Sequence, residues 1–227
     1  MSLTPSRTET LARARSDLRL GLPVVLTHGG SAMLAAAVEE LSNERLQSLR
    51  RFGPMELALT ARRAETLKAR VYDGDLVRLS VPKEADLRWL CALANPTDDL
   101  NTPLKGPLHA LRDGSADLHR TALVLAKSAQ LLPAMLLVAL PDGSSFAAQH
   151  HLTLVSDDLW PDLTRLAPLS SVVSARLPIQ ASNAGRLHIF RPDDGGAEHY
   201  AVEIGRPDRA EPVLTRLHSA CFTGDVL

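Results

Sequence analysis

Residues 118–140 read LHRTALVLAKSAQLLPAMLLVAL, a helix-like pattern that runs directly into a strand-like one. From Leu118 the apolar side chains recur at steps of four, three, four and three residues, which places them on one face of a helix. After Pro133 the run AMLLVAL has no polar residue, as is typical of a strand buried on both faces. A helix followed at once by a buried strand predicts layered α and β structure.

The N-terminal part of the chain predicts a helix, a strand and a second helix in succession. Ser6 and Glu9 have the spacing of a capping box, which opens the first helix. Residues 22–27, LPVVLT, read as a buried strand that Gly29-Gly30 ends. Apolar residues within 34–49 then recur at helical intervals, so a helix is expected after the glycine turn.

The same alternation continues along the chain to about residue 174. A loop is expected at 97–106, where Asn95-Pro96 ends a helix pattern, and PDGSS at 141–145 is expected to form a turn. Further strand-like and helix-like runs cover residues 55–60, 60–70, 76–81, 83–94, 151–156 and 157–167.

The pattern changes to hairpins after Pro178. Strand-like runs at 185–191, 197–204 and 213–219 are separated by PDDGG and GRPDRAEP, which are rich in turn residues. The predicted fold class is therefore α+β. It consists of a layered α/β domain over residues 1–174, followed by the first hairpins of a β-rich domain over residues 175–227.

Composition limits the classes of function. The chain has 227 residues with 25 Lys and Arg against 26 Asp and Glu, so no basic stripe is expected and nucleic-acid binding is disfavoured. No apolar run approaches the roughly 20 residues that span a bilayer, and the N-terminus resembles no secretory signal. We therefore expect a cytoplasmic protein without membrane contact, in which Cys91 and Cys221 stay reduced.

Residues 216–225, RLHSACFTGD, concentrate more reactive groups than any other stretch. Cys221 is of a type that ligates metal or acts as a nucleophile, and Arg216 could hold a phosphate. The alternative is a strand that ends in a polar turn with a small buried thiol, because free cysteines are commonly buried and inert.

This motif, together with LPIQASNAGRLHIFR, EHYAVEIG and PVLTRLHS before it, resembles the opening of the catalytic domain of GTP cyclohydrolase II. That enzyme starts riboflavin biosynthesis by a zinc-dependent opening of the imidazole ring of GTP, with magnesium assisting the release of pyrophosphate. The resemblance implies that Cys221 is the first of three zinc ligands. It also implies a GTP-binding stretch made of Arg216, Leu217, His218, Ser219 and Ala220, the last standing where many members have Glu.

The family's second and third zinc cysteines follow about ten residues after this motif, and the chain ends at Leu227 before them. A catalytic zinc needs about three protein ligands and an open water position. We therefore expect this chain to be incomplete and inactive alone, without a complete set of catalytic residues. The alternative is a non-catalytic structural or partner-binding module derived from the bifunctional riboflavin enzyme.

Residues 10–174 resemble the dihydroxybutanone phosphate synthase domain that precedes the cyclohydrolase in bifunctional proteins; the likeness lies in LRLGLPVVL and LVLAKSAQLLPAMLLVAL. That domain holds Mg²⁺ through an acidic loop, whereas here THGGSAMLAAAVEEL follows the first strand, and Leu118–Thr121 stands where the family has H-T-E-A. The resemblance therefore implies a degenerate domain that serves as a structural or dimerising scaffold, and a homodimer.

Three other features have simpler interpretations. The turn THGGS at 27–31 lacks the Lys and Ser/Thr of a phosphate-binding loop. His119 is expected on the polar face of its helix, and His150-His151 at a solvated strand end.

Overall fold

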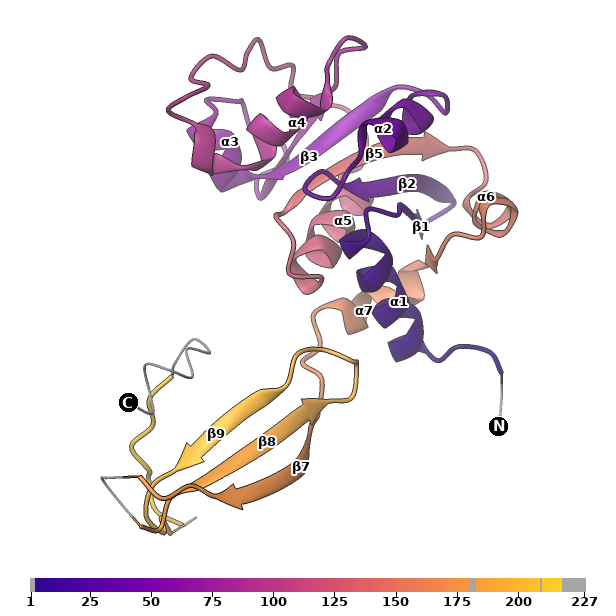
Figure 1. Cartoon of the computed structure of the whole chain (residues 1–227). Coiled ribbons are helices and arrows are strands. Elements are labelled where there is room, and N and C mark those ends of the chain that lie inside the picture. Colours follow the sequence, from indigo (N-terminus) through magenta and orange to yellow (C-terminus); the bar gives the residue numbers. More distant parts are fainter. Residues whose placement is uncertain (1–2, 180–182, 209, 218–227) are drawn as a thin grey trace. The chain divides into compact units, whose positions relative to one another are not determined.

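The computed structural model describes residues 3–179, 183–208 and 210–217, and the chain forms two compact units, Met1–Arg165 and Leu166–Leu227 (Figure 1). The predicted boundary between residues 174 and 175 lies too late, within the strand β7 (Leu169–Arg176). Because β7 pairs along its length with β8 (Arg186–Pro192), it belongs to the second unit.

The first unit is built on a mixed six-stranded sheet in the order β4-β3-β5-β2-β1-β6 (Figure 1). All neighbouring strands are antiparallel except β1 and β6, which pair in parallel. The strands are β1 Val24–His28, β2 Ser31–Ala37, β3 Met55–Thr60, β4 Leu76–Ser80, β5 Ala134–Leu140 and β6 Leu154–Val155. The predicted α+β class is confirmed.

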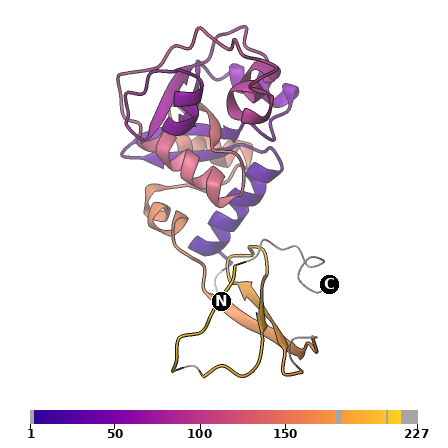
Figure 2. The same cartoon turned by 90° about the vertical axis from the view of Figure 1, so that its left-hand side faces the viewer.

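Helices cover both faces of this sheet, so the first unit has three layers (Figures 1 and 2). One hydrophobic cluster packs under α1 (Arg7–Arg19), α5 (Asp117–Ser128) and α7 (Trp160–Leu163). The cluster on the other face packs under α2, α3, α4 and α6, which span Asn43–Arg50, Ala61–Thr66, Leu87–Ala94 and Gly143–His150. Short 3-10 turns occupy Pro96–Asp98 and Asp157–Leu159.

The elements with the clearest sequence signals form as predicted. The capping box at the start of α1 is complete, because Glu9 N–H donates to Ser6 Oγ at 3.2 Å and Ser6 N–H donates to Glu9 Oε2 at 2.7 Å. The helix and the buried strand expected within residues 118–140 are α5 and β5, and β5 lies between β3 and β2 inside the sheet.

The helix predicted directly after Gly29-Gly30 is wrong. These glycines form the two-residue turn of a hairpin, with His28 opposite Ser31 and φ values of 54° and 83°. Positive φ at both central positions matches the twist of paired strands and favours glycine. Strand β2 follows and is buried on both faces, so it lacks the alternation of polar and apolar residues that marks a half-buried strand. The expected helix is limited to α2, which begins after the N-cap Ser42.

The turn predicted at 141–145 is instead the start of α6. Asp142 caps this helix by accepting a hydrogen bond from Ser145 N–H at 3.0 Å, so the polar turn residues act as an N-cap. The strand expected at 151–156 is reduced to the two residues of β6. His150 therefore ends a helix, not a strand, and His151 is its left-handed C-cap with φ 55°.

Alanines line the contact between the sheet and the helices α1 and α5. Both helices contact β2, the strand with the sequence SAMLAAA. The alanines are almost fully buried and belong to one hydrophobic cluster; they are Ala14, Ala35, Ala37, Ala58, Ala122 and Ala126. Their small side chains let the two helices approach the sheet closely.

The second unit is an antiparallel sheet in the order β7-β8-β9, where β9 is His199–Glu203. Two of the three strand-like runs predicted here are thus confirmed, and β7 provides a third strand. The strand expected at 213–219 is not formed over 213–217, which pairs with no described strand, and residues 218–219 lie outside the described residues. Within the part of the chain that the structure describes, no helix is both long and apolar enough to cross a bilayer.

Candidate functional site

Only the first two residues of the predicted site are described. Arg216 and Leu217 are exposed in a segment without regular secondary structure, and Leu217 is 97% accessible. His218, Ser219, Ala220 and Cys221 lie outside the described residues. The proposed grouping of the Cys221 thiol with the Arg216 guanidinium therefore stays a prediction from the sequence.

The sheet that precedes this segment is strongly amphipathic. Val173, Ile189 and Tyr200 lie opposite one another across the three strands, as do Ala175, Leu187 and Val202. Because directly opposed residues share a face, these six side chains form one surface, the apolar face of the second unit.

The side chains of this apolar face are not buried. Val173, Tyr200 and Val202 are each about half exposed, at 51%, 53% and 49%, and Pro192 is the only apolar side chain that is buried among the described residues 166–217. The expectation of a half-buried strand at 197–204 is correct in its alternation and wrong in its burial. A three-stranded sheet without a covered face has little hydrophobic stabilisation of its own.

The opposite face of the same sheet is more polar, although Phe190 also lies on it. His188 on β8 and Glu203 on β9 are joined by a contact of 3.1 Å between Nε2 and Oε2. Arg186 donates to the Ser174 hydroxyl at 2.8 Å across β7 and β8. This face suits water, and the apolar one suits a hydrophobic partner layer.

Comparison with known proteins shows what the second unit is similar to. Residues 170–227 match the family model of GTP cyclohydrolase II. Over this segment the chain is similar to the GTP cyclohydrolase II family. The matched residues include the whole Arg216–Asp225 motif, β8, β9 and all of β7 except Leu169, so the resemblance on which the prediction rested is confirmed.

Similarity to curated proteins extends over both units. The chain is 35% identical over 225 residues to "GTP cyclohydrolase-2" of Azospirillum brasilense, an alignment that covers 95% of this chain and 58% of that protein. It is 32% identical over 148 residues to "Riboflavin biosynthesis protein RibBA" of Aquifex aeolicus, covering 59% of this chain and 36% of that protein. A third relative, "GTP cyclohydrolase-2" of Neisseria meningitidis, is 44% identical over 59 residues, which are 26% of this chain and 29% of that protein.

The chain thus spans little more than half the length of its Azospirillum relative, and less of the other two. Since the Azospirillum alignment includes 225 residues, the first unit is part of the similarity as well as the family segment. The relationship of the first unit to the synthase domain stays a prediction.

A buried histidine and a carboxylate form an unpredicted pair in the first unit. His119 is 2% exposed, and its Nε2 lies 2.6 Å from Oε2 of Glu56 on β3. The expected place of His119 on the polar face of α5 is wrong, because this face packs on β3, where Glu56 supplies a polar partner. The other ring nitrogen, Nδ1, has no hydrogen-bond partner among the described residues.

The first unit offers no clear metal centre within the described residues, where no three His, Cys, Asp or Glu side chains are grouped to hold an ion. Cys91 lies half-buried on α4, and burial together with the charge of Asp86 raises the pKa of its thiol. A raised pKa keeps the thiol protonated near neutral pH, which disfavours metal ligation and nucleophilic attack.

Charged side chains outside the predicted site stabilise the loop after α4. Arg63 donates to the carbonyl oxygens of Leu93 at 2.6 Å, Ala92 at 2.9 Å and Asn95 at 3.3 Å, and so caps the C-terminus of α4. Its guanidinium also binds both oxygens of Asp99, at 2.5 and 2.8 Å.

Lys105 binds the same carboxylate, and the hydrogen bonds from Arg63 and Lys105 hold the pKa of Asp99 far below its usual range. Since one carboxylate here orders two cations and a helix end, we assign this cluster a structural role.

Proposed function

We propose that this chain is part of a GTP cyclohydrolase II, an enzyme that opens the imidazole ring of GTP in riboflavin biosynthesis and releases formate and pyrophosphate. The observation that carries the proposal is the family match over residues 170–227, because it includes the motif with the predicted GTP-binding and metal-binding residues. The names of the Azospirillum and Aquifex relatives support the same pathway.

In this proposal Arg216 contributes a guanidinium to the GTP site, next to Leu217, His218, Ser219 and Ala220. A guanidinium fork matches the geometry of phosphate oxygens and stays charged at all physiological pH values. Its exposure in the described structure leaves it free to meet a nucleotide, since no described residue forms an ion pair with it.

Cys221 would provide one thiolate to a zinc ion, which when bound makes a water molecule nucleophilic near neutral pH. One sulfur does not fit a zinc ion alone, and among the described residues no three His, Cys, Asp or Glu side chains are grouped to hold one. The remaining ligands would come from sequence corresponding to the part of the relatives that this chain does not cover. Magnesium is the second metal of the proposed reaction.

The first unit would act as a scaffold that carries the catalytic unit and forms a homodimer. Two hydrophobic clusters stabilise this unit, and polar side chains such as Glu56 and His119 bind each other inside it. Both features suit a structural role. We further place the protein in the cytoplasm, without nucleic-acid or membrane partners, because its charges are balanced and its Aquifex relative is named for riboflavin biosynthesis.

The decisive experiment compares this 227-residue chain with a form extended by its natural downstream sequence. We expect stoichiometric zinc and GTP-dependent release of formate only in the extended form. Within that form Cys221→Ser should abolish both, and Arg216→Gln should raise KM for GTP. Arg206→Gln, which changes another exposed arginine of the second unit, serves as the matched control and should leave KM unchanged.

Full zinc content and turnover in the Cys221→Ser variant would refute the proposed ligand. An extended form that binds no zinc and releases no formate would instead support the non-catalytic module. Ribulose 5-phosphate conversion by the first unit would overturn the scaffold role.

A further inference from the structure

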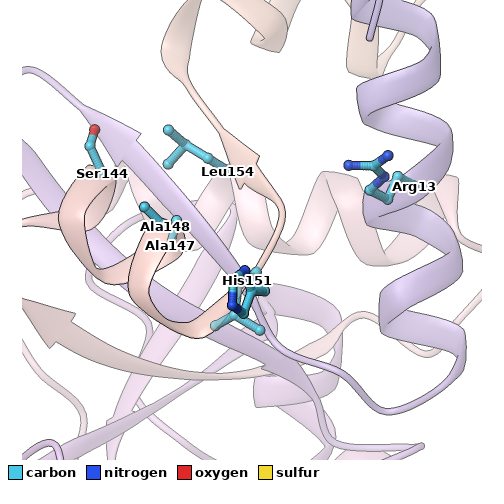
Figure 3. A pocket seen from close by; sticks show the side chains of 7 residues that line it. Arg13, Ser144, Ala147, Ala148, His151 and Leu154 are labelled. Carbon is cyan, nitrogen blue, oxygen red and sulfur yellow. The ribbon is translucent and has the colours of Figure 1, made fainter. Parts of the chain in front are cut away.

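The first unit has a hollow of about 430 Å³ between α1, α6 and β6 (Figure 3). Its apolar lining consists of Ala147 and Ala148 on α6 together with Leu152 and Leu154 just after it. Arg13 on α1 and His151 at the end of α6 add a guanidinium and an imidazole, and no described aspartate or glutamate lines the hollow. The volume falls within the range of small-molecule sites, which is roughly 300–1,000 Å³.

The two basic side chains have no partner of their own among the described residues. Arg13 makes no hydrogen bond or salt bridge with any of them. Hydrogen bonds with Ser6 lower the pKa of Glu9, and the charge of Arg13 lowers it slightly further. His151 likewise makes no side-chain hydrogen bond to a described residue. By contrast, the neighbouring Arg7 on the same helix binds both Asp158 and Asp162.

The backbone conformation fixes the position of His151 at the end of α6. His151 has φ 55°, and Leu152 N–H donates to the Ala147 carbonyl at 2.9 Å, which closes the C-terminus of α6 around the histidine. Arg13 lies across the hollow on α1, with its guanidinium on the side toward α6 and His151 (Figure 3). The two basic groups thus approach the apolar lining from two different helices.

We propose that this hollow binds a small organic anion, with its charged group at Arg13 and His151 and its apolar or aromatic body on the alanine and leucine side chains. A guanidinium binds carboxylate and phosphate oxygens through two parallel hydrogen bonds, and no described acidic side chain competes for that of Arg13. Because no acidic side chain of the described residues lines the hollow, the anion meets no like charge there. The site is independent of the proposed GTP site, which lies in the second unit.

The test is a titration of the 227-residue chain followed by backbone amide NMR shifts, with phenyl phosphate and benzoate as probes. Phenol, which lacks the charge, and inorganic phosphate, which lacks the apolar body, are the matched control probes. We expect saturable shifts at α6 and residues 151–154 for at least one aryl anion at about 10 mM, a concentration that saturates a site of millimolar affinity. Comparison of the phosphate with the carboxylate distinguishes the two anion types.

Variants then locate the charged group. Arg13→Gln should weaken binding about tenfold or more, since a charge-assisted hydrogen bond is lost. His151→Asn, which also tolerates positive φ, should weaken it severalfold. Arg62→Gln changes an exposed arginine on α3, which packs at the opposite edge of the sheet, and should leave affinity unchanged.

Three results would overturn the proposal. These are no saturable shift with either aryl anion, unchanged affinity in both Arg13→Gln and His151→Asn, or inorganic phosphate binding as tightly as phenyl phosphate. The last result would mean that charge alone attracts the ion and that the apolar lining has no part in recognition.

Discussion

The pair of Glu56 and His119 provides a quantitative test of how the first unit is stabilised. We consider Glu56→Leu, which removes the only described hydrogen-bond partner of a ring that is 2% exposed and whose Nδ1 already has none. A buried polar group left without a partner costs about 1–3 kcal/mol. The Glu56 side chain is 29% exposed, so the new leucine gains only part of the free energy of full burial. We therefore expect the free energy of unfolding to fall by about 1–3 kcal/mol.

Replacing His119 instead of Glu56 should lower the free energy of unfolding by less. In His119→Leu the carboxylate of Glu56 remains 29% exposed and can bind water, so we expect a loss of about 1 kcal/mol or less. The double variant with leucine at both positions should be close to wild type, because two apolar side chains replace two polar ones that needed each other. The pair would then show a coupling energy of roughly 1–4 kcal/mol, the sum of the two single losses.

Urea unfolding monitored by tryptophan fluorescence measures these values. Both tryptophans, Trp89 and Trp160, belong to the first unit, so the signal reports that unit alone. Glu65→Leu, on the exposed side of α3, is the matched control and should change stability by less than about 0.5 kcal/mol. The reasoning fails if Glu56→Leu is as stable as wild type, or if the double variant loses the sum of the two single losses.

Three further predictions concern other parts of the first unit. Replacing Gly29 and Gly30 together by alanine should lower the free energy of unfolding by about 2–4 kcal/mol, because each alanine must adopt positive φ at about 1–2 kcal/mol; equal stability in urea would contradict the hairpin. Arg63→Met should cost about 1–3 kcal/mol in the same assay, because three carbonyl groups lose their donor while Asp99 keeps Lys105. Because Arg63 and Lys105 lower the folded-state pKa of Asp99, its stabilisation is present above the unfolded pKa of about 3.9 and is lost as pH falls further. Urea unfolding between about pH 5 and pH 2.5 should therefore show a steeper loss in wild type than in Asp99→Asn.

Controls for this second group come from the same elements. Arg62→Met, an exposed neighbour of Arg63 on α3, should leave stability within about 0.5 kcal/mol of wild type. A methyl group added at Gly29 or Gly30 would meet no described atom within 4 Å, so any loss in their variants reflects backbone conformation and not a clash. An identical acid profile in wild type and Asp99→Asn would show that another carboxylate causes the loss.

Sequence patterns predicted the elements whose own residues carry a clear local signal, such as a regular spacing of apolar side chains. The stripe in α5, the apolar run of β5 and the capping box of α1 each have a local signal, and each formed as expected. Strand β2 was missed because burial on both faces removes the alternation that distinguishes a strand, leaving Leu34 and Val38 at a helical interval. The pair Gly29-Gly30 was the signal that could have corrected this, since two glycines between apolar runs favour a hairpin.

Contacts between distant segments had no comparable signal. Glu56 and His119 are 63 residues apart, and nothing in either segment shows that α5 packs on β3 with these side chains facing each other. Arg13 and His151 are likewise brought to one hollow only by the packing of α1 beside β6. The Arg216–Asp225 motif was found for a different reason, because its residue types and spacing identify a family without any knowledge of the fold.

The alanines between β2 and the helices α1 and α5 set how far apart these layers stand. A larger residue at Ala35 or Ala37 would push a whole helix outward, and overpacking of this kind costs about 1–3 kcal/mol. The strain would be relieved by a smaller side chain in the helix above, at Ala14 or Ala122, yet only glycine is smaller and it weakens a helix. Single substitutions at these alanines should therefore be tolerated poorly, and changes here should occur together in the strand and in the helix that packs on it.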